Sequence, residues 1–272
     1  MVWTIATFYK FVPLADLDRL QLDVLAHCQQ WELCGTILLA PEGINATVAG
    51  DRQSIDQLLA WLSGHAAIGS FEHQDFTTTR APFERLKVKL KDEIVALGRP
   101  DVDPTHQVGT YVDPQDWNQL ITDPDLLLID TRNAFEVEMG TFEGAISPNT
   151  RAFCDLPAYV KVNLDPERHK KIAMFCTGGI RCEKATAYML NQGFEQVYHL
   201  KGGILNYLNK IPPTNSLWRG ECFVFDDRVA VDHTLQPIPY VLCGGCGHPV
   251  SPAEQSSPPL CARGITCPPL PI

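Results

Sequence analysis

The sequence predicts a three-part protein, with an α+β unit followed by an α/β unit and a small cysteine-rich segment. The first part runs through strand-like and helix-like stretches in the order β-α-β-β-α-β, which is that of the split βαβ, ferredoxin-like motif. The second part contains continuous apolar runs separated by helical stretches, as in a buried parallel sheet. The last part is rich in Pro, Gly and Cys and has little periodicity. We place these parts at residues 1–100, 108–215 and 216–272.

In the first part, five short runs have the β-branched and apolar character of strands. They are Thr4–Phe11, Gly35–Ala40, Asn45–Ala49, Phe71–Thr79 and Leu86–Leu90. Between them, apolar residues recur at helical spacing from Leu17 to Cys28 and again from Ile55 to Leu62. The Pro41–Ile44 sequence supplies turn chemistry between the second and third strands. The Gly98–Pro104 segment reads as a linker that ends the unit.

In the second part, Leu126–Ile129 and Ile172–Phe175 are continuous apolar runs that predict buried strands. Gln196–Leu200 is a third short strand, and helical spacing precedes it around Ala185 and Tyr188. The segment from about residue 216 is too small and loop-like to form a core unaided. We expect either a metal ion to support it or the segment to pack along the other parts.

The composition is that of an ordinary soluble protein, with 45% hydrophobic and 20% charged residues. No apolar run reaches the roughly 20 residues that span a bilayer, and the first residues lack a signal-peptide pattern. We therefore expect a cytoplasmic protein without a membrane partner. The net charge of −10 argues mildly against a general nucleic-acid binder, although a local basic face is compatible with one.

Ten cysteines in a reducing compartment are more typical of thiols, catalytic groups or metal ligands than of disulfides. Four of them are scattered along the chain, and we predict that these are small core residues: Cys28, Cys34, Cys154 and Cys222. The others fall into two groups, one around Cys176 and one in the carboxyl-terminal segment.

The most informative segment is the loop Cys176-Thr177-Gly178-Gly179-Ile180-Arg181-Cys182, which follows a predicted buried strand and leads into a helix. Adjacent glycines let successive N–H groups point inward, and the helix N-terminus adds its positive dipole end. Such a field lowers the pKa of a thiol, so Cys176 is a candidate nucleophile. The competing interpretation is a buried structural cysteine beside a tight turn.

The spacing within this loop bears on its chemistry. Cys176 and Arg181 are separated by four residues, one fewer than in the Cys-x5-Arg loop of tyrosine phosphatases, which surrounds a tetrahedral phosphate. The shorter ring better suits a sulfur-sized group on Cys176 and disfavours a phosphatase. Cys182 is open to two interpretations, as a resolving thiol for Cys176 or as a packed helix residue.

Three further motifs accompany the loop: Asp130-Thr-Arg132, Glu143-Gly-Ala-Ile146 and His199-Leu-Lys-Gly-Gly-Ile204. Together with the Cys176 loop they resemble a rhodanese domain. The resemblance implies that Cys176 can carry a persulfide and that Asp130 and Arg132 help to hold the domain and its site together. A purely structural ion pair between Asp130 and Arg132 is the alternative, and it is compatible with the same domain.

The resemblance extends over roughly residues 4–250. In order along the chain, the segments that carry it are Tyr9–Pro13, Leu39–Asn45, Arg85–Lys91, Val108–Val112, Cys176–Ala185 and Gly220–Asp232. They resemble the rhodanese-domain tRNA uridine hydroxylases. This implies an acylphosphatase-like first domain, tRNA as partner, and oxidation of uridine 34 to 5-hydroxyuridine with molecular oxygen as co-substrate. The family's essential cysteine aligns with Cys176.

The residues themselves show an activated cysteine and no nucleotide or flavin fingerprint, so oxygen chemistry rests on the resemblance alone. A sulfurtransferase that carries persulfide on Cys176 is the alternative enzyme. A catalytically silent binding module is a third class. The intact loop argues against it, because a silent copy has no need of a thiol there.

Two further groups of residues are candidate sites. Arg85, Lys87, Lys89 and Lys91 alternate, so on a strand they form a basic stripe that either contacts tRNA phosphates or is a solvated edge. Cys243 and Cys246 form half of a zinc-ribbon pattern. The second pair is incomplete, with Cys261 and Cys267 as substitutes, so we expect zinc to bind weakly if it binds there.

Overall fold

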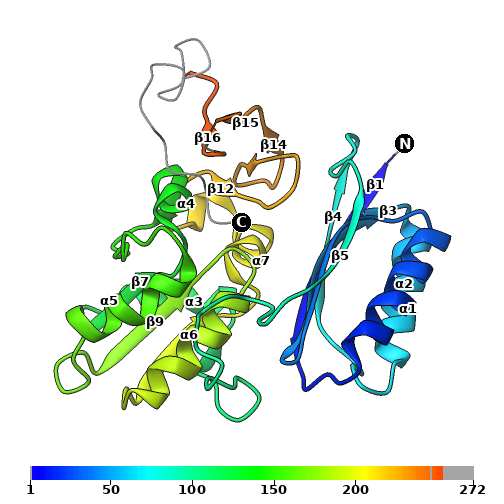
Figure 1. The fold of residues 1–272 in the computed structure, drawn as a ribbon. Helices are drawn as coiled ribbons and strands as arrows, with labels where there is room; N and C mark the ends of the chain where they lie inside the picture. The colour runs from blue at the N-terminus through cyan, green and yellow to red at the C-terminus, as the bar shows by residue number, and fades with distance from the viewer. Residues whose placement is uncertain (1, 246, 254–272) are drawn as a thin grey trace. The chain divides into compact units, whose positions relative to one another are not determined.

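The computed structural model describes residues 2–245 and 247–253 (Figure 1). The chain divides into two compact units, Met1–Gln107 and Val108–Ile272. Within the described residues, none of the helices combines the length and the hydropathy required to cross a membrane. The basic stripe belongs to the first unit and the Cys176 loop to the second.

The first unit has the predicted ferredoxin-like fold, which confirms the fold class. Its strands are β1 (Trp3–Phe11), β2 (Cys34–Ala40), β3 (Gly43–Gly50), β4 (His73–Thr78) and β5 (Leu86–Leu90). The sheet order is β4-β1-β3-β2-β5, and β5 lies parallel to β2 as an additional edge strand. Helices α1 (Leu17–Gln30) and α2 (Arg52–Gly64) cover the same face of this sheet (Figure 1).

The turn between β2 and β3 explains one of the motifs that carry the family resemblance. Gly43 has a φ of +147°, and a Cβ there would lie 2.0 Å from the carbonyl oxygen of Lys10, so only glycine fits. Glu42 Oε1 accepts a hydrogen bond from the Ile94 N–H at 2.7 Å, and Asn45 donates to the Ile94 carbonyl at 3.1 Å. The motif therefore anchors the segment that follows β5.

The second unit contains the predicted parallel sheet. Its order is β6-β10-β9-β7, with bounds Thr110–Val112, Gln196–Leu200, Lys171–Phe175 and Leu126–Asp130, and every pair in it is parallel. The helices of this unit are α3 (Pro114–Ile121), α4 (Ala134–Met139), α5 (Leu156–Asn163), α6 (Ile180–Asn191) and α7 (Gly203–Lys210). Short 3₁₀ turns occupy Phe153–Asp155 and Pro213–Asn215. The α/β prediction is thus confirmed.

The described part of the carboxyl-terminal segment packs along the α/β sheet unit. Strand β11 (Trp218–Gly220) pairs with β8 (Gly140–Phe142), which follows α4. Strands β12 (Cys222–Phe223), β13 (Ala230–Val231) and β14 (Pro237–Ile238) form a small sheet, and β15 (Val241–Leu242) pairs with β16 (Pro249–Val250). Packing along another part was one of the two expectations for this segment.

The prediction for the scattered cysteines was wrong at one position. Cys28 and Cys222 are buried and Cys34 is half-buried, but Cys154 is exposed. Cys154 lies in the 3₁₀ turn Phe153–Asp155, where Phe153 is the residue that reaches the core. A turn of this length can bury only one of its side chains, and the larger apolar one takes that place.

Candidate functional site

The Cys176 loop joins β9 to α6, as the strand-loop-helix pattern predicted. Cys176 is only 1% exposed, and the N–H of Gly179 donates to its Sγ atom at 3.1 Å. Gly179 has a φ of +101°, which turns the chain inward before α6 begins at Ile180. From the opposite side, the N–H groups of Ile204 and Leu205 donate to the carbonyls of Cys176 and Thr177 at 2.9 and 3.1 Å. The loop is therefore held between two helix N-termini.

The surroundings of Cys176 favour its thiolate. Burial alone would raise the pKa of Cys176, but hydrogen bonds from Cys182 and Gly179 and the charge of Arg181 lower it to about 6. Burial and the adjacent Cys176 sulfur raise the pKa of Cys182 well above its usual value. Cys182 is thus the protonated donor of the pair and Cys176 the thiolate at neutral pH. Thr131 lies 3.6 Å from the Cys182 sulfur.

Arg181 is fixed by a carboxylate that the sequence analysis did not single out. Its two terminal nitrogens donate to Glu136 Oε2 and Oε1 at 2.6 and 2.8 Å, and the Glu136 side chain is fully buried. Burial raises the pKa of Glu136, but the Arg181 guanidinium outweighs it and holds this pKa below its usual value. A guanidinium engaged at both nitrogens is poorly placed to clamp a phosphate, which agrees with the argument from loop length.

The sequence did contain a signal for Glu136. Asn133 and Glu136 are spaced as a capping box, and at the start of α4 Glu136 Oε2 accepts a hydrogen bond from the Asn133 N–H at 3.0 Å, which is one half of that box. The same carboxylate therefore caps α4 and pairs with Arg181. The residue spacing indicates the helix cap, but it does not indicate the ion pair between Glu136 and Arg181.

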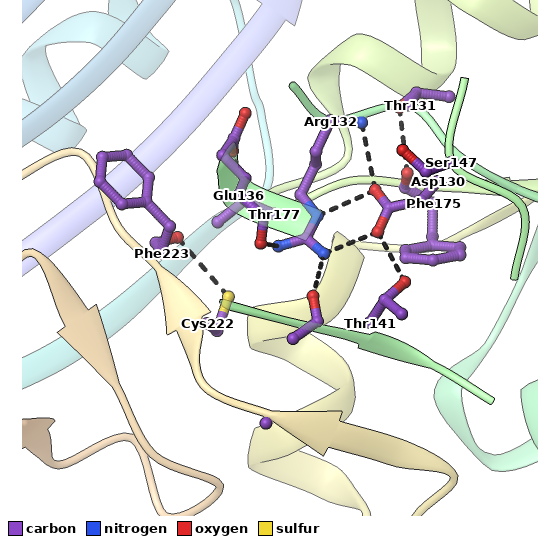
Figure 2. A network of polar contacts seen from close by, with 12 residues as sticks. Asp130, Thr131, Arg132, Glu136, Thr141, Ser147, Phe175, Thr177, Cys222 and Phe223 are labelled. Carbon is purple, nitrogen blue, oxygen red and sulfur yellow. Dashed lines mark hydrogen bonds and ion pairs between the residues drawn. The ribbon is translucent and has the colours of Figure 1, made fainter. Parts of the chain in front are cut away.

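Asp130 and Arg132 form a second buried ion pair, with both side chains fully buried (Figure 2). Arg132 Nε and Nη2 donate to the two Asp130 oxygens at 2.9 and 2.6 Å. Arg132 also donates to the backbone carbonyls of Glu136 and Gly140 at 3.2 and 2.5 Å, and its guanidinium lies 5.1 Å from the ring centre of Trp218. The pair links the end of β7 to both ends of α4 and to β11.

Comparison with known proteins places these features in a family. Residues 3–94 match the UPF0176 acylphosphatase like domain, and residues 113–210 match the Rhodanese-like domain. A tRNA uridine(34) hydroxylase from a Picosynechococcus species is 53% identical over 266 residues, which is 98% of this chain and 89% of that protein. The chain belongs to the tRNA uridine(34) hydroxylase family. Both expectations from the resemblance, the acylphosphatase-like first domain and the rhodanese domain, are confirmed.

Two solved structures that resemble part of this tRNA uridine(34) hydroxylase family member are rhodanese proteins. A rhodanese-like domain from Anabaena is 20% identical, with a TM-score of 0.34, and covers 40% of this chain and 78% of its own. A rhodanese-related protein from Thermoplasma volcanium is 22% identical, with a TM-score of 0.31, and covers 38% of this chain and 95% of its own.

The structure brings together some of the candidate residues of this tRNA uridine(34) hydroxylase family member. Asp130, Arg132 and the loop from Cys176 to Cys182 lie in one unit, and Glu136 contacts both arginines. The basic stripe belongs to the other unit. Only Lys87 and Lys89 lie within β5, while Arg85 and Lys91 lie just outside its ends. Whether these residues contact tRNA stays a prediction.

The zinc prediction falls mostly outside the described residues. Cys243 is buried, whereas Cys246, Cys261 and Cys267 are not among the residues that the structure describes. Within residues 2–245 and 247–253, no three His, Cys, Asp or Glu side chains are grouped so as to hold a metal ion. The zinc site therefore stays a prediction.

Proposed function

We propose that this chain hydroxylates uridine 34 of tRNA to 5-hydroxyuridine, as a cytoplasmic oxidoreductase with molecular oxygen as co-substrate. The observation that carries the proposal is the 53% identity over 98% of the chain to a tRNA uridine(34) hydroxylase. The Cys176 loop, with its thiol hydrogen-bonded and its charge partner in place, is consistent with a working site rather than a silent one.

In this proposal Cys176 is the nucleophile. A thiolate can add to C6 of a uracil ring: the S–C6 bond forms, the C5–C6 double bond opens, and its electron pair moves toward C5 and O4. Such an addition makes C5 electron-rich, and C5 is the atom that receives oxygen. Loss of the C5 proton and release of the thiolate then restore the double bond. The thiolate is available because the pKa of Cys176 is about 6.

The overall change replaces C5–H with C5–OH. One atom of molecular oxygen enters the base, and the other leaves as water with two protons and two electrons from a cellular reductant. Labelling with ¹⁸O₂ tests the source of the inserted atom. The proposal expects a mass increase of two daltons in 5-hydroxyuridine, and incorporation from labelled water instead would contradict it.

Nucleoside mass spectrometry of tRNA tests the function itself. Cells without this protein should lack 5-hydroxyuridine at position 34. The wild-type chain should restore it, and the Cys176→Ala variant should not. A Cys154→Ala variant is the matched control, because that cysteine is exposed on a 3₁₀ turn. Restoration by Cys176→Ala would remove Cys176 from the reaction.

One observation favours a second candidate, a sulfurtransferase. The short loop, with the Gly179 N–H aimed at Cys176 Sγ, suits an extra sulfur atom on that thiolate. Such an enzyme would take sulfur from a donor such as thiosulfate, releasing sulfite, and pass it from the Cys176 persulfide to an acceptor. The same experiment separates the two functions, because loss of a thiolated nucleoside, with 5-hydroxyuridine retained, would support sulfur transfer.

A further inference from the structure

Phe225 is an exposed aromatic residue in an otherwise buried aromatic cluster. Its side chain is 61% exposed, whereas Phe223 and Phe135 are 6% and 9% exposed. The three rings follow one another edge to face, with centroids 5.1 Å apart for Phe135 and Phe223 and 5.0 Å apart for Phe223 and Phe225. The inner two rings are core residues, and the outer one presents its surface to solvent.

A rigid turn holds Phe225 in this position. The residue follows β12, and a bidentate ion pair closes the turn that leads to β13, with Arg228 Nε and Nη2 donating to the Asp226 carboxylate at 2.8 and 2.6 Å. Both side chains of this pair are nearly buried, at 7% and 2% exposed. Backbone hydrogen bonds between Val224 and Val229 and between Val229 and Asp226, at 2.9 and 3.0 Å, complete the turn. Because these bonds hold the turn, the exposed Phe225 ring is pre-organised for contact with a ligand.

The ring lies beside the Cys176 loop. The guanidinium carbon of Arg181 is 5.7 Å from the Phe225 ring centre, a cation–π distance. Arg181 lies in the first turn of α6, and its charge acts on the Cys176 thiolate. Phe225 therefore contacts the residue whose charge acts on the Cys176 thiolate, and it lies at the edge of the candidate site.

We propose that Phe225 is the platform on which the base of nucleotide 34 stacks when it is presented to Cys176. The inference rests on the proposed function and names a substrate-binding residue for it. Enzymes that act on a single base take it out of its stack and hold it against aromatic side chains. An uncharged pyrimidine ring suits this place, because the adjacent guanidinium is already neutralised by Glu136 and is not free for a phosphate.

Steady-state kinetics with a synthetic anticodon stem-loop that carries uridine 34 test the proposal. Phe225→Ala and Phe225→Leu should each raise KM roughly five- to hundredfold, the range expected for loss of one stacked base. Phe225→Tyr should stay within about twofold, because it keeps the ring. Leucine retains apolar contact with Phe223 but cannot stack, so it separates stacking from packing.

Two controls exclude indirect effects. Val162→Ala removes another strongly exposed apolar side chain, 81% exposed on α5, and should leave KM unchanged. The pH profile of Cys176 alkylation and the unfolding midpoint should be unchanged in Phe225→Ala. A shifted profile or a lower midpoint that accounts for the kinetic loss would make Phe225 a structural residue and overturn the proposal.

A binding measurement gives a readout that does not depend on turnover. The Phe225→Trp variant adds one tryptophan to the five of the wild-type chain, whose fluorescence is the reference. The added fluorescence should be quenched by the stem-loop that carries uridine 34. A stem-loop that is abasic at position 34 should not quench it. Equal quenching by both RNAs, or a wild-type KM in Phe225→Ala, would overturn the proposal. If the wild-type chain forms no 5-hydroxyuridine, the proposed function fails, and the abasic comparison still decides whether Phe225 binds the base.

Discussion

The groups that lower the pKa of Cys176 lie within six residues of it along the chain. Gly179, Arg181 and Cys182 all belong to the loop or the first turn of α6, so their joint effect was foreseeable from the local sequence. The direction of the Cys182 effect was not foreseeable. The sequence is compatible with Cys182 as a resolving thiol or as a packing residue, and in the structure Cys182 donates a hydrogen bond to Cys176.

A pair of substitutions tests the donor role of Cys182. Cys182→Ala removes the hydrogen bond, so the pKa of Cys176 should rise from about 6 toward the ordinary thiol value. Cys182→Ser keeps a donor and should leave the pKa of Cys176 low, although it cannot form a disulfide. The measurement is the pH dependence of iodoacetamide alkylation at Cys176, followed by mass spectrometry. Identical profiles for the Ala variant and the wild type would refute the donor role.

Glu136 shows what the local sequence could not reveal. Its ion pair with Arg181 joins residues 45 positions apart, and only the packing of α4 against the loop creates it. The spacing of Asn133 and Glu136 is typical of a helix cap, but it gives no reason to expect an arginine opposite.

Replacing Glu136 tests the importance of that pair. Glu136→Gln removes the carboxylate that is paired with the buried Arg181 guanidinium, which should lower the free energy of unfolding by about 3–5 kcal/mol. Glu143→Gln is the matched control: its pair with Arg219 is 58% and 59% exposed, so the loss should be under about 1 kcal/mol. Urea unfolding of both variants at neutral pH gives the two values, and equal losses would contradict the assignment.

The same pair predicts a pH dependence. The pKa of Glu136 is lowered in the folded protein, so the carboxylate stabilises the fold fully above its unfolded pKa. This stabilisation is lost as the pH falls through the lowered folded value. The stability gap between wild type and Glu136→Gln should therefore be constant near neutral pH and close only in acid. A gap that closes at neutral pH would show that another group is responsible.

At the scale of elements, the boundaries of the strands were predicted more closely than the roles of the side chains on them. β5 occupies the predicted Leu86–Leu90, and β10 the predicted Gln196–Leu200. The apolar runs identify these strands because their residues must reach a core. Side chains that face solvent have no such constraint, so the role of the basic stripe on β5 could not be read from its pattern.

A triple substitution on and beside β5 tests the stripe. Changing Lys87, Lys89 and Lys91 to Gln should weaken tRNA binding and flatten its dependence on salt. With fewer phosphate contacts, fewer counterions are released when tRNA binds. The matched control changes three exposed cations of the second unit to Gln: Lys161, Arg168 and Lys170. Filter binding over a range of salt gives both slopes. Equal slopes in the two triple variants would show that the stripe is only a solvated edge.

At the scale of the whole molecule, the order of the two folds followed from sequence periodicity, but the course of the last segment did not. Its short strands have two or three residues each, too few for a periodic pattern. The pairing of β11 with distant β8 depends on tertiary contacts. Trp218 is 3% exposed and Phe223 is 6% exposed, so both rings complete the core of the second unit.

Truncation tests this dependence. A fragment of residues 108–215 lacks both rings, and each fully buried aromatic side chain contributes roughly 1.5–3 kcal/mol. That loss is a large share of a typical domain stability of about 5–15 kcal/mol. A fragment of residues 108–251 should unfold cooperatively, whereas the shorter one should have a much lower midpoint or none. Equal thermal midpoints by circular dichroism would show that the rhodanese sheet is self-sufficient.

Gly203, at the start of α7, limits how this protein can evolve. Its φ is +66°, and a Cβ there would lie 2.5 Å from the Cys176 carbonyl oxygen and 2.6 Å from that of Thr177. The loop and the helix therefore have no slack between them, and they share two backbone hydrogen bonds. An insertion beside Cys176 or Thr177 would have to keep both carbonyls in place against α7. Evolution of a longer loop in a descendant of this chain is therefore restricted to positions after these two residues.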